Sequence, residues 1–301
     1  MIGSPSKMSG VDPALRHVAR FLPTGSALHR GLTVPRVIMG LAGRIGELPR
    51  ISIARVNPDV TVRIHRPAGR AGSGPALLWI HGGGTVMGSA AQEDKHCRRL
   101  ADHCDITVVA VDHRLAPEHP YPTPLLDCYE ALRWLARQSW IDPARIAIGG
   151  ASAGGGLTAA LALLARERAD ITPVLQLMTY PMLDDRTGTT PDSRARIMWS
   201  GQDNQIAWRC YLNGSDPAHA SPARRTDLEG LPTAWIGVGT LDLFYPESVA
   251  YGERLRAANV PTHTEIATGA FHAFDMIAPN APVSQRFFAS QCHALRTALA
   301  P

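Results

Sequence analysis

The chain has 301 residues, 45% of them hydrophobic, so it is long enough to bury an ample core within a single α/β domain. Its formal charge is only +4, and its basic side chains, all arginines except Lys7 and Lys95, are scattered among acidic ones. This scatter excludes the basic stripe typical of nucleic-acid-binding proteins, so we expect no nucleic-acid partner.

The cysteine and hydropathy patterns indicate the compartment. The five cysteines are odd in number and include no C-x-x-C pair, which argues against a disulfide framework or a zinc ribbon. The first ten residues lack the apolar core of a signal peptide, and no apolar run approaches the length of a membrane span. We therefore expect a cytoplasmic protein without a membrane span.

Residues 1–48 are predicted to form helices ahead of the first strand. In the segment 11–22, Asp12 is a candidate N-cap and Pro13 takes the first helical position, where proline is common. A second helical segment, 34–45, is apolar on most faces. Two helices in this position suggest a cap or lid.

Residues 49–301 alternate between strand and helix patterns, as in an α/β domain. Strands are predicted at 51–56, 60–66, 76–81, 106–113, 145–150, 173–180, 233–239 and 262–267. Helices are predicted at 91–103, 125–138, 157–168, 246–258 and 283–299. This alternation indicates a mostly parallel, eight-stranded sheet with helices on both faces. Residues 183–229 break the alternation, and we interpret them as an insertion that completes the cap.

A strand-to-helix turn centred on Ser152 contains the strongest single motif. The sequence GASAG at 150–154 fits G-x-S-x-G, in which small residues flank a serine on a tight turn. An apolar strand precedes the turn and a strong helix pattern follows it, so the positive end of the helix dipole faces the serine oxygen. This context makes Ser152 a candidate nucleophile.

A histidine and three glycines, with sequence HGGG, follow the third predicted strand at its carboxyl end, where ligands bind in open α/β sheets. We assign the backbone N–H groups of Gly83, Gly84 and Ala153 to an oxyanion hole. His81 and Gly82 are interpreted as supports that shape the loop. Neither G-K-[ST] nor G-x-G-x-x-G is present, so a phosphate-binding role is disfavoured.

The remaining members of a Ser–Asp–His triad are expected after two late strands. Asp242 follows the strand 233–239, and His272 follows the strand 262–267, which places the three residues in the order Ser, Asp, His. Asp242 would orient the imidazole, and His272 would take the proton of Ser152 and pass it to the leaving group.

Other acidic and histidine residues are weaker candidates. Glu247 falls inside the helix that follows Asp242, so we interpret it as a support. Asp275 is too near His272 in sequence to approach it from another loop. His263 lies within a strand and His293 within the last helix, where packing or surface roles are more common.

Two further features invite other interpretations. His96-Cys97 and His103-Cys104 recur after seven residues, but this spacing does not fit zinc motifs, and a buried helix face is preferred. We expect no metal and no cofactor. Trp199, Trp208 and Tyr211, in the insertion, would line an acyl pocket or pack the lid against the body.

With HGGG, Ser152, Asp242 and His272 in place, the chain resembles the hormone-sensitive-lipase-like family of bacterial carboxylesterases, in the branch whose serine motif is GTSAGG. The sequences DHRLAPEHPYP at 112–122 and SPARRTDLEGLPTAWIGVGTLDLF at 221–244 carry the resemblance further. It implies an α/β-hydrolase fold with a helical cap, hydrolysis of short- to medium-chain acyl esters, small hydrophobic ester substrates, no cofactor and often a homodimer.

The chain departs from the family pattern at four positions. Ala151 stands where Thr or Asp is usual, and Thr85 where an aromatic residue is common. Ala273 replaces the glycine that usually follows the histidine, and His113 replaces a tyrosine. The leading hypothesis is a serine carboxylesterase. An amidase or deacetylase on the same triad and a non-catalytic small-molecule receptor are the alternatives.

Overall fold

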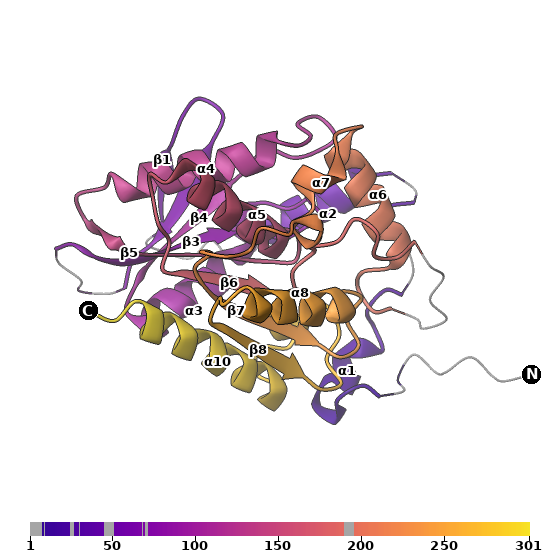
Figure 1. The fold of residues 1–301 in the computed structure, drawn as a ribbon. Coiled ribbons are helices and arrows are strands. Elements are labelled where there is room, and N and C mark those ends of the chain that lie inside the picture. The colour runs from indigo at the N-terminus through magenta and orange to yellow at the C-terminus, as the bar shows by residue number, and fades with distance from the viewer. Residues whose placement is uncertain are drawn as a thin grey trace, which may run out of the picture.

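An eight-stranded sheet runs through the computed structural model, which describes residues 8, 10–24, 27–29, 31–44, 51–67, 69, 72–189 and 196–301 (Figure 1). The strands lie in the order β1-β2-β4-β3-β5-β6-β7-β8. Their bounds are β1 Ser52–Arg55, β2 Thr61–His65, β3 Gly74–Ile80, β4 Thr107–Asp112, β5 Ile141–Ala151, β6 Leu175–Thr179, β7 Thr233–Gly239 and β8 Thr262–Ala267. The pairs β1/β2 and β2/β4 are antiparallel and the other pairs are parallel. The predicted mostly parallel, eight-stranded sheet is confirmed.

Helices cover both faces of this sheet because its central strands are apolar on both sides. In β3, Leu78 and Ile80 belong to one core, and Leu77 and Trp79 belong to the other. The first core is covered by α4 (Thr123–Ala136), α5 (Ala153–Arg168) and α8 (Tyr245–Ala257), and the second by α3 (Asp94–Cys104) and α10 (Pro282–Ala298) (Figure 1).

Two predicted helices are shorter than expected and begin with a 3₁₀ turn. The turn η2 (Ala90–Glu93) precedes α3, and the turn η1 (Pro13–Leu15) precedes α1 (Arg16–Ala19). Asp12 caps η1 as predicted, because its Oδ1 accepts a hydrogen bond from Ala14 N at 2.8 Å. The helix α1 ends before Pro23, whose ring cannot continue it.

Three helices lie at the end of the molecule toward which the parallel strands point: α2 (Thr33–Arg44), α6 (Gly201–Leu212) and α7 (Pro217–Ala220) (Figure 1). The amino-terminal segment and the insertion contact each other. Leu28 N donates to Asp203 Oδ1 at 2.9 Å, and Thr24 forms an isolated β-bridge with Ile197. Of the two segments expected to form a cap, residues 1–7, 9, 25, 26, 30, 45–48 and 190–195 lie outside the described residues.

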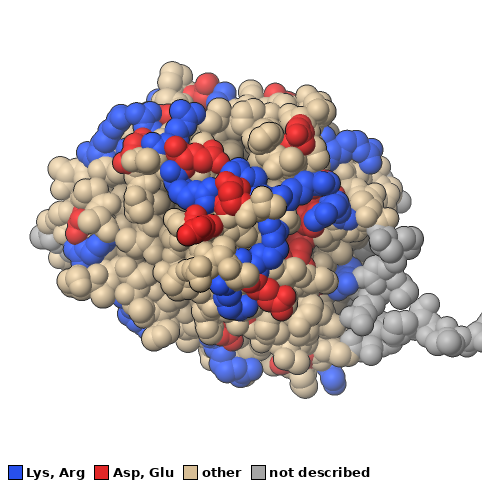
Figure 2. Space-filling model, in the orientation of Figure 1, with Lys and Arg blue, Asp and Glu red and all other residues tan. Residues whose placement is uncertain are grey.

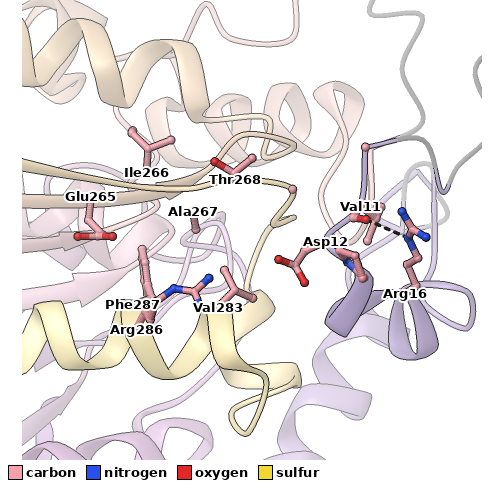
Figure 3. A pocket seen from close by; sticks show the side chains of 13 residues that line it. Val11, Asp12, Arg16, Glu265, Ile266, Ala267, Thr268, Val283, Arg286 and Phe287 are labelled. Carbon is pink, nitrogen blue, oxygen red and sulfur yellow. Dashed lines mark hydrogen bonds between the residues drawn. The ribbon is translucent and has the colours of Figure 1, made fainter.

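The amino-terminal segment also crosses the end of β8. Asp12 N donates to Gly269 O at 2.9 Å, and Arg16 Nε donates to Val11 O at 3.1 Å (Figure 3). A surface cleft of about 390 Å³ lies between this segment, the end of β8 and α10 (Figure 3). Its lining contains none of the predicted site residues, so the cleft is a separate feature of the surface.

Basic and acidic side chains are interleaved on the face shown in Figure 2. Arg166 pairs with Asp227 at 2.6 Å, and Arg224 pairs with Asp185 at 2.6 Å. This face therefore presents no broad region of one charge. Within the described ranges, no helix combines the length and apolar character needed to cross a bilayer.

The start of the segment that leaves β6 is anchored to α8 by Glu247. The carboxylate of Glu247 accepts hydrogen bonds from Leu183 N at 2.6 Å and Asp184 N at 3.4 Å, and Thr187 Oγ1 donates to the same group. The side chain is buried, and this burial raises the pKa of Glu247 to about 8 against the opposing effect of its hydrogen bonds. Glu247 thus ties the insertion to the helix that follows Asp242.

Close packing of α5 against β3 depends on Gly154. A Cβ at this position would lie 2.0 Å from Ile80 O and 2.6 Å from His81 O. We expect Gly154→Ala to lower the free energy of unfolding by about 1–3 kcal/mol, because the two backbones must separate. Gly252→Ala in α8 is the matched control, since its nearest neighbour is the side-chain atom Thr264 Oγ1 at 3.0 Å. Equal effects of the two changes in urea unfolding would contradict this account.

The ionisation of Glu247 makes stability depend on pH. Its folded pKa of about 8 lies above the ordinary value, so its stabilising contribution is complete below about pH 4 and is lost as the pH rises through about 8. We expect Glu247→Gln to reduce the fall in Tm between about pH 5 and about pH 9 by about 2–5 °C. Thermal unfolding across this range measures the effect. Exposed Glu253, also in α8, supplies the control Glu253→Gln, which should leave the fall unchanged.

Candidate active site

Ser152 lies on a tight turn between β5 and α5. Its backbone angles are φ 58° and ψ −119°, and such a positive φ is uncommon for a residue with a side chain. Ser152 N donates to Thr179 O at 2.9 Å, while Ser152 O accepts from Gly156 N and Met182 N, each at 3.0 Å. These bonds hold the strained strand-to-helix turn that the G-x-S-x-G sequence predicts.

His272 and Asp242 reach Ser152 from two other loops. Asp242 follows β7, and His272 lies between β8 and α9 (Phe274–Ile277). His272 Nε2 is 3.0 Å from Ser152 Oγ, and His272 Nδ1 is 2.8 Å from Asp242 Oδ2. All three side chains are buried. The structure therefore brings together the three residues that the sequence selects as a triad.

These contacts decide which ring nitrogen of His272 carries the proton. A carboxylate only accepts hydrogen bonds, so Nδ1 donates to Asp242, and Nε2 keeps its lone pair toward the serine hydroxyl. Asp242 is itself held in place, because its Oδ1 accepts from Phe244 N at 3.0 Å. In this arrangement Ser152 Oγ can pass its proton to Nε2 while it attacks an electrophile.

The glycine loop that follows β3 lies against the serine turn. In the parallel pair β3/β5, Ile80 is opposite Gly150, so the loops that leave the two strands emerge side by side. A Cβ on Gly82 would lie 3.0 Å from Ala151 O and 3.3 Å from Ser152 Cβ. The absence of a side chain at Gly82 allows this approach.

The predicted oxyanion donors are on the two glycines that follow. Gly83 has φ 119° and Gly84 has φ 62°, both in the region that glycine adopts without steric cost. Within the described residues, neither N–H group donates to a protein acceptor. Both donors are therefore available to a substrate oxygen, next to the amino-terminal end of α5 and the N–H of Ala153.

His81 supports this loop from inside the protein. Its Nδ1 is 2.8 Å from Gly82 O, and its ring stacks on that of His113, with centroids 4.1 Å apart and planes 6° apart. Burial, followed by the proximity of His113, lowers the pKa of His81, and burial also lowers the pKa of His113. Both rings are neutral near pH 7. The histidine at 113, where the family has tyrosine, is thus a stacking partner of the HGGG motif.

At two other positions where the chain departs from the family pattern, the backbone lies in the left-handed region. Ala273 has φ 61° and Thr85 has φ 63°. Glycine adopts this conformation at lower cost than a residue with a Cβ, which explains why glycine is usual after the histidine. Thr85 Oγ1 donates to Gly84 O at 2.5 Å. Nothing in the structure explains Ala151.

The weaker candidates lie away from Ser152 Oγ. Asp275, in α9, accepts a hydrogen bond from Tyr180 OH at 3.0 Å, whereas Asp242 takes the contact to His272. His263 lies in β8 and His293 in α10, and both are exposed.

The two His-Cys pairs do not share one buried helix face. In α3, His96, Cys97 and Cys104 are buried, but His103 is exposed, so the predicted burial is wrong for His103. Its ring packs edge-on against Phe288, at 5.2 Å between centroids, and its Nδ1 lies 2.9 Å from Arg99 O. In the part of the chain that the structure describes, no group of three His, Cys, Asp or Glu side chains is placed to hold a metal ion.

One aromatic residue of the insertion, Trp199, approaches the glycine loop. Trp199, Trp208 and Tyr211 are buried. A Cβ on Gly84 would lie 2.6 Å from Cη2 of Trp199, so this indole packs against the Cα of Gly84.

Two buried residues beside the site belong to no sequence motif. Glu93 ends η2 at 1% exposure, and Tyr180 follows β6 at 1% exposure. A lone acid near a predicted helix start and a tyrosine after a strand are common in any α/β protein, so the sequence offers no signal that selects them.

Known proteins share this architecture and much of this sequence. The family model described as alpha/beta hydrolase fold matches residues 77–276. Esterase LipI of Mycobacterium tuberculosis is 33% identical over 286 residues, which cover 88% of each chain. Esterase LipW of Mycobacterium marinum has a TM-score of 0.89 at 34% identity, covering 99% of each chain. A bacterial heroin esterase has a TM-score of 0.88 at 31% identity, covering 98% of this chain and 100% of its own. The chain therefore belongs to the α/β-hydrolase fold family, in its hormone-sensitive-lipase-like branch.

Proposed function

We propose that the protein is a serine carboxylesterase that hydrolyses small, hydrophobic, short- to medium-chain acyl esters through an acyl-enzyme. Ser152 is the nucleophile, His272 the general base and acid, and Asp242 the residue that orients His272. The observation that carries the proposal is the 3.0 Å contact between Ser152 Oγ and His272 Nε2. Relatives named as esterases support ester substrates over amides.

In the acylation step, Ser152 Oγ forms a bond to the carbonyl carbon of the ester while its proton moves to His272 Nε2. The carbonyl oxygen becomes an oxyanion, and the N–H groups of Gly83, Gly84 and Ala153 donate to it. Each such donor typically stabilises the transition state by about 2.7–4 kcal/mol. The C–O bond to the alcohol then breaks, and His272 returns the proton to the leaving oxygen.

Deacylation repeats these steps with water as the nucleophile. His272 Nε2 removes a proton from a water molecule, whose oxygen attacks the acyl carbon. The second oxyanion collapses, the bond to Ser152 Oγ breaks, and the serine recovers its proton from His272. Asp242 stays ionised throughout and stabilises the imidazolium formed in each half-reaction.

Residues 1–48 and 183–229 form a cap over a catalytic domain of residues 49–301. The β-bridge between Thr24 and Ile197 and the bond from Leu28 N to Asp203 support a single cap built from both segments. Contact between Trp199 and Gly84 supports a role for this cap in shaping the acyl site.

We place the protein in the cytoplasm. Its five cysteines are all free thiols, four of them buried, which suits a reducing compartment.

A homodimer through the outer edge of β8 is also part of the proposal. This strand pairs with β7 on one side, and no strand among the described residues pairs with its other side. An unpaired edge offers free N–H and C=O groups to a second chain, and Ile266 on this strand is 36% exposed.

A series of p-nitrophenyl esters, from acetate to a long acyl chain, tests the catalytic proposal. We expect turnover that is highest on short chains and falls by about 10³-fold or more in Ser152→Ala. The matched control is Ser284→Ala in α10, a buried serine whose hydroxyl has no partner among the described side chains, and its activity should equal that of the wild type.

Labelling with a serine-reactive phosphonate shows whether Ser152 is a reactive nucleophile even if none of the tested esters is a substrate. Wild-type protein that hydrolyses no ester and is not labelled at Ser152 would overturn the proposed function. Labelling without ester turnover would direct attention to amides, which the same triad can cleave.

Light scattering after size-exclusion chromatography tests the dimer. We expect twice the mass of a single chain for the wild type and a single-chain mass for Ile266→Lys, because a charge on the edge opposes strand pairing. A single-chain mass for the wild type at all concentrations tested would reject the dimer.

A further inference from the structure

A cluster of three buried polar side chains lies between the glycine loop and the loop of His272. It consists of Glu93 from η2, Tyr180 after β6 and Asp275 from α9, with exposed fractions of 1%, 1% and 5%. No step of the proposed mechanism uses these groups. Buried carboxyl groups reduce stability unless they are well paired, so their presence beside the site calls for a role.

Glu93 is linked to the first glycine of the HGGG motif through Gln92. The carboxylate of Glu93 accepts hydrogen bonds from Gln92 Nε2 at 3.1 Å and from Trp79 Nε1 at 3.4 Å. Gln92 Nε2 also lies 3.4 Å from Gly82 O, so the carbonyl group of Gly82 is held by the side chain that Glu93 fixes. The peptides that carry the Gly83 and Gly84 donors follow directly.

Asp275 acts on the other loop through Tyr180. Tyr180 OH donates to Asp275 Oδ1 at 3.0 Å. The ring of Tyr180 packs against the imidazole of His272, with centroids 4.9 Å apart and planes at 64°. Phe244 also contacts this imidazole, at 5.3 Å and 79°. The hydroxyl bond to Asp275 therefore fixes a ring on which the orientation of His272 depends.

The two carboxyl groups are coupled by charge. Burial and, to a smaller extent, the nearby charge of Asp275 together raise the pKa of Glu93 to about 7, against the hydrogen bonds it accepts. Burial raises the pKa of Asp275 to about 6, against the bond from Tyr180 and the attraction of His272. Cys97 on α3 also faces Glu93. Like charges in a buried site resist joint ionisation, so the second negative charge forms only as the pH rises through about 7.

We propose that Glu93 and Asp275 are positioning residues for the esterase reaction, Glu93 through Gly82 for the oxyanion donors and Asp275 through Tyr180 for His272. This inference rests on the proposed function. The ionised form of Glu93 is the better support, because a carboxylate accepts stronger hydrogen bonds from Gln92 and Trp79 than a neutral carboxyl does.

The variant Glu93→Gln tests this by comparison at two pH values. Protonated glutamic acid and glutamine both lack the charge, so kcat should differ by about twofold or less near pH 6 and by about tenfold near pH 8.5, with KM unchanged. The matched control is Asp94→Asn, the adjacent carboxylate, which is paired with Arg63 at 2.6 Å. This control should lower Tm and leave kcat unchanged at both pH values.

Tyr180→Phe and Asp275→Asn test the second half. Tyr180→Phe removes only the hydroxyl that reaches Asp275, and we expect each change to lower kcat about tenfold with KM unchanged. The proposal is overturned if the wild-type to Glu93→Gln ratio of kcat is the same at both pH values, or if none of the three variants lowers kcat more than Asp94→Asn.

Stability measurements keep this inference separate from the proposed function. The folded pKa values of both carboxyls are raised, so their stabilising contribution is complete below about pH 4 and is lost as the pH rises through about 6–7. Glu93→Gln should reduce that loss of Tm, whatever the substrate. A flattened Tm profile without Ser152 labelling in the wild type would mean that the buried pair is correctly described and that the catalytic proposal fails.

Discussion

The close approach of two loops at the centre of the sheet is the constraint on which the rest of the site depends. β3 and β5 are parallel neighbours, and Gly154 packs against Ile80 O with no room for a side chain. Because the carboxyl ends of parallel strands meet at one edge, the glycine loop and the serine turn leave the sheet together. Small residues then allow backbone N–H groups to stand near Ser152 Oγ. A side chain at either contact would separate Ser152 from the backbone N–H groups proposed as oxyanion donors.

The acid and the base come to this point from the adjoining strands. β6 and β7 follow β5 in the sheet, and β8 follows β7, so Asp242 and His272 leave neighbouring strands on the same edge. The hydrogen bond from Nδ1 to Asp242 selects the tautomer of the imidazole, which directs the lone pair of Nε2 to Ser152. The order of the strands thus brings Asp242 and His272 to Ser152, and the hydrogen bonds orient the imidazole of His272.

Buried ionisable groups surround this arrangement in greater number than a triad requires. His81 and His113 stack as neutral rings below the glycine loop, while Glu93 and Asp275 keep carboxyl groups out of water beside it. In a medium of low dielectric constant each of these groups favours its neutral form. Fixed dipoles near an active site need little reorganisation during a reaction, and the proposed positioning role of Glu93 and Asp275 would offset their cost in stability in this way.

The sequence by itself determined the order along the chain of the eight strands and of the long helices outside the insertion, the serine turn, the glycine loop and the positions of Asp242 and His272. These features depend on local patterns, apolar periodicity and small residues at tight turns, which a linear reading detects. Only the tertiary structure decided that His113 stacks on His81, that Glu247 binds the start of the insertion, and that Glu93 and Tyr180 lie beside the site. The sequence did not anticipate that His103 would be exposed. Such contacts join residues far apart in the chain, and the sequence around a single histidine, glutamate or tyrosine does not predict which residue it will contact.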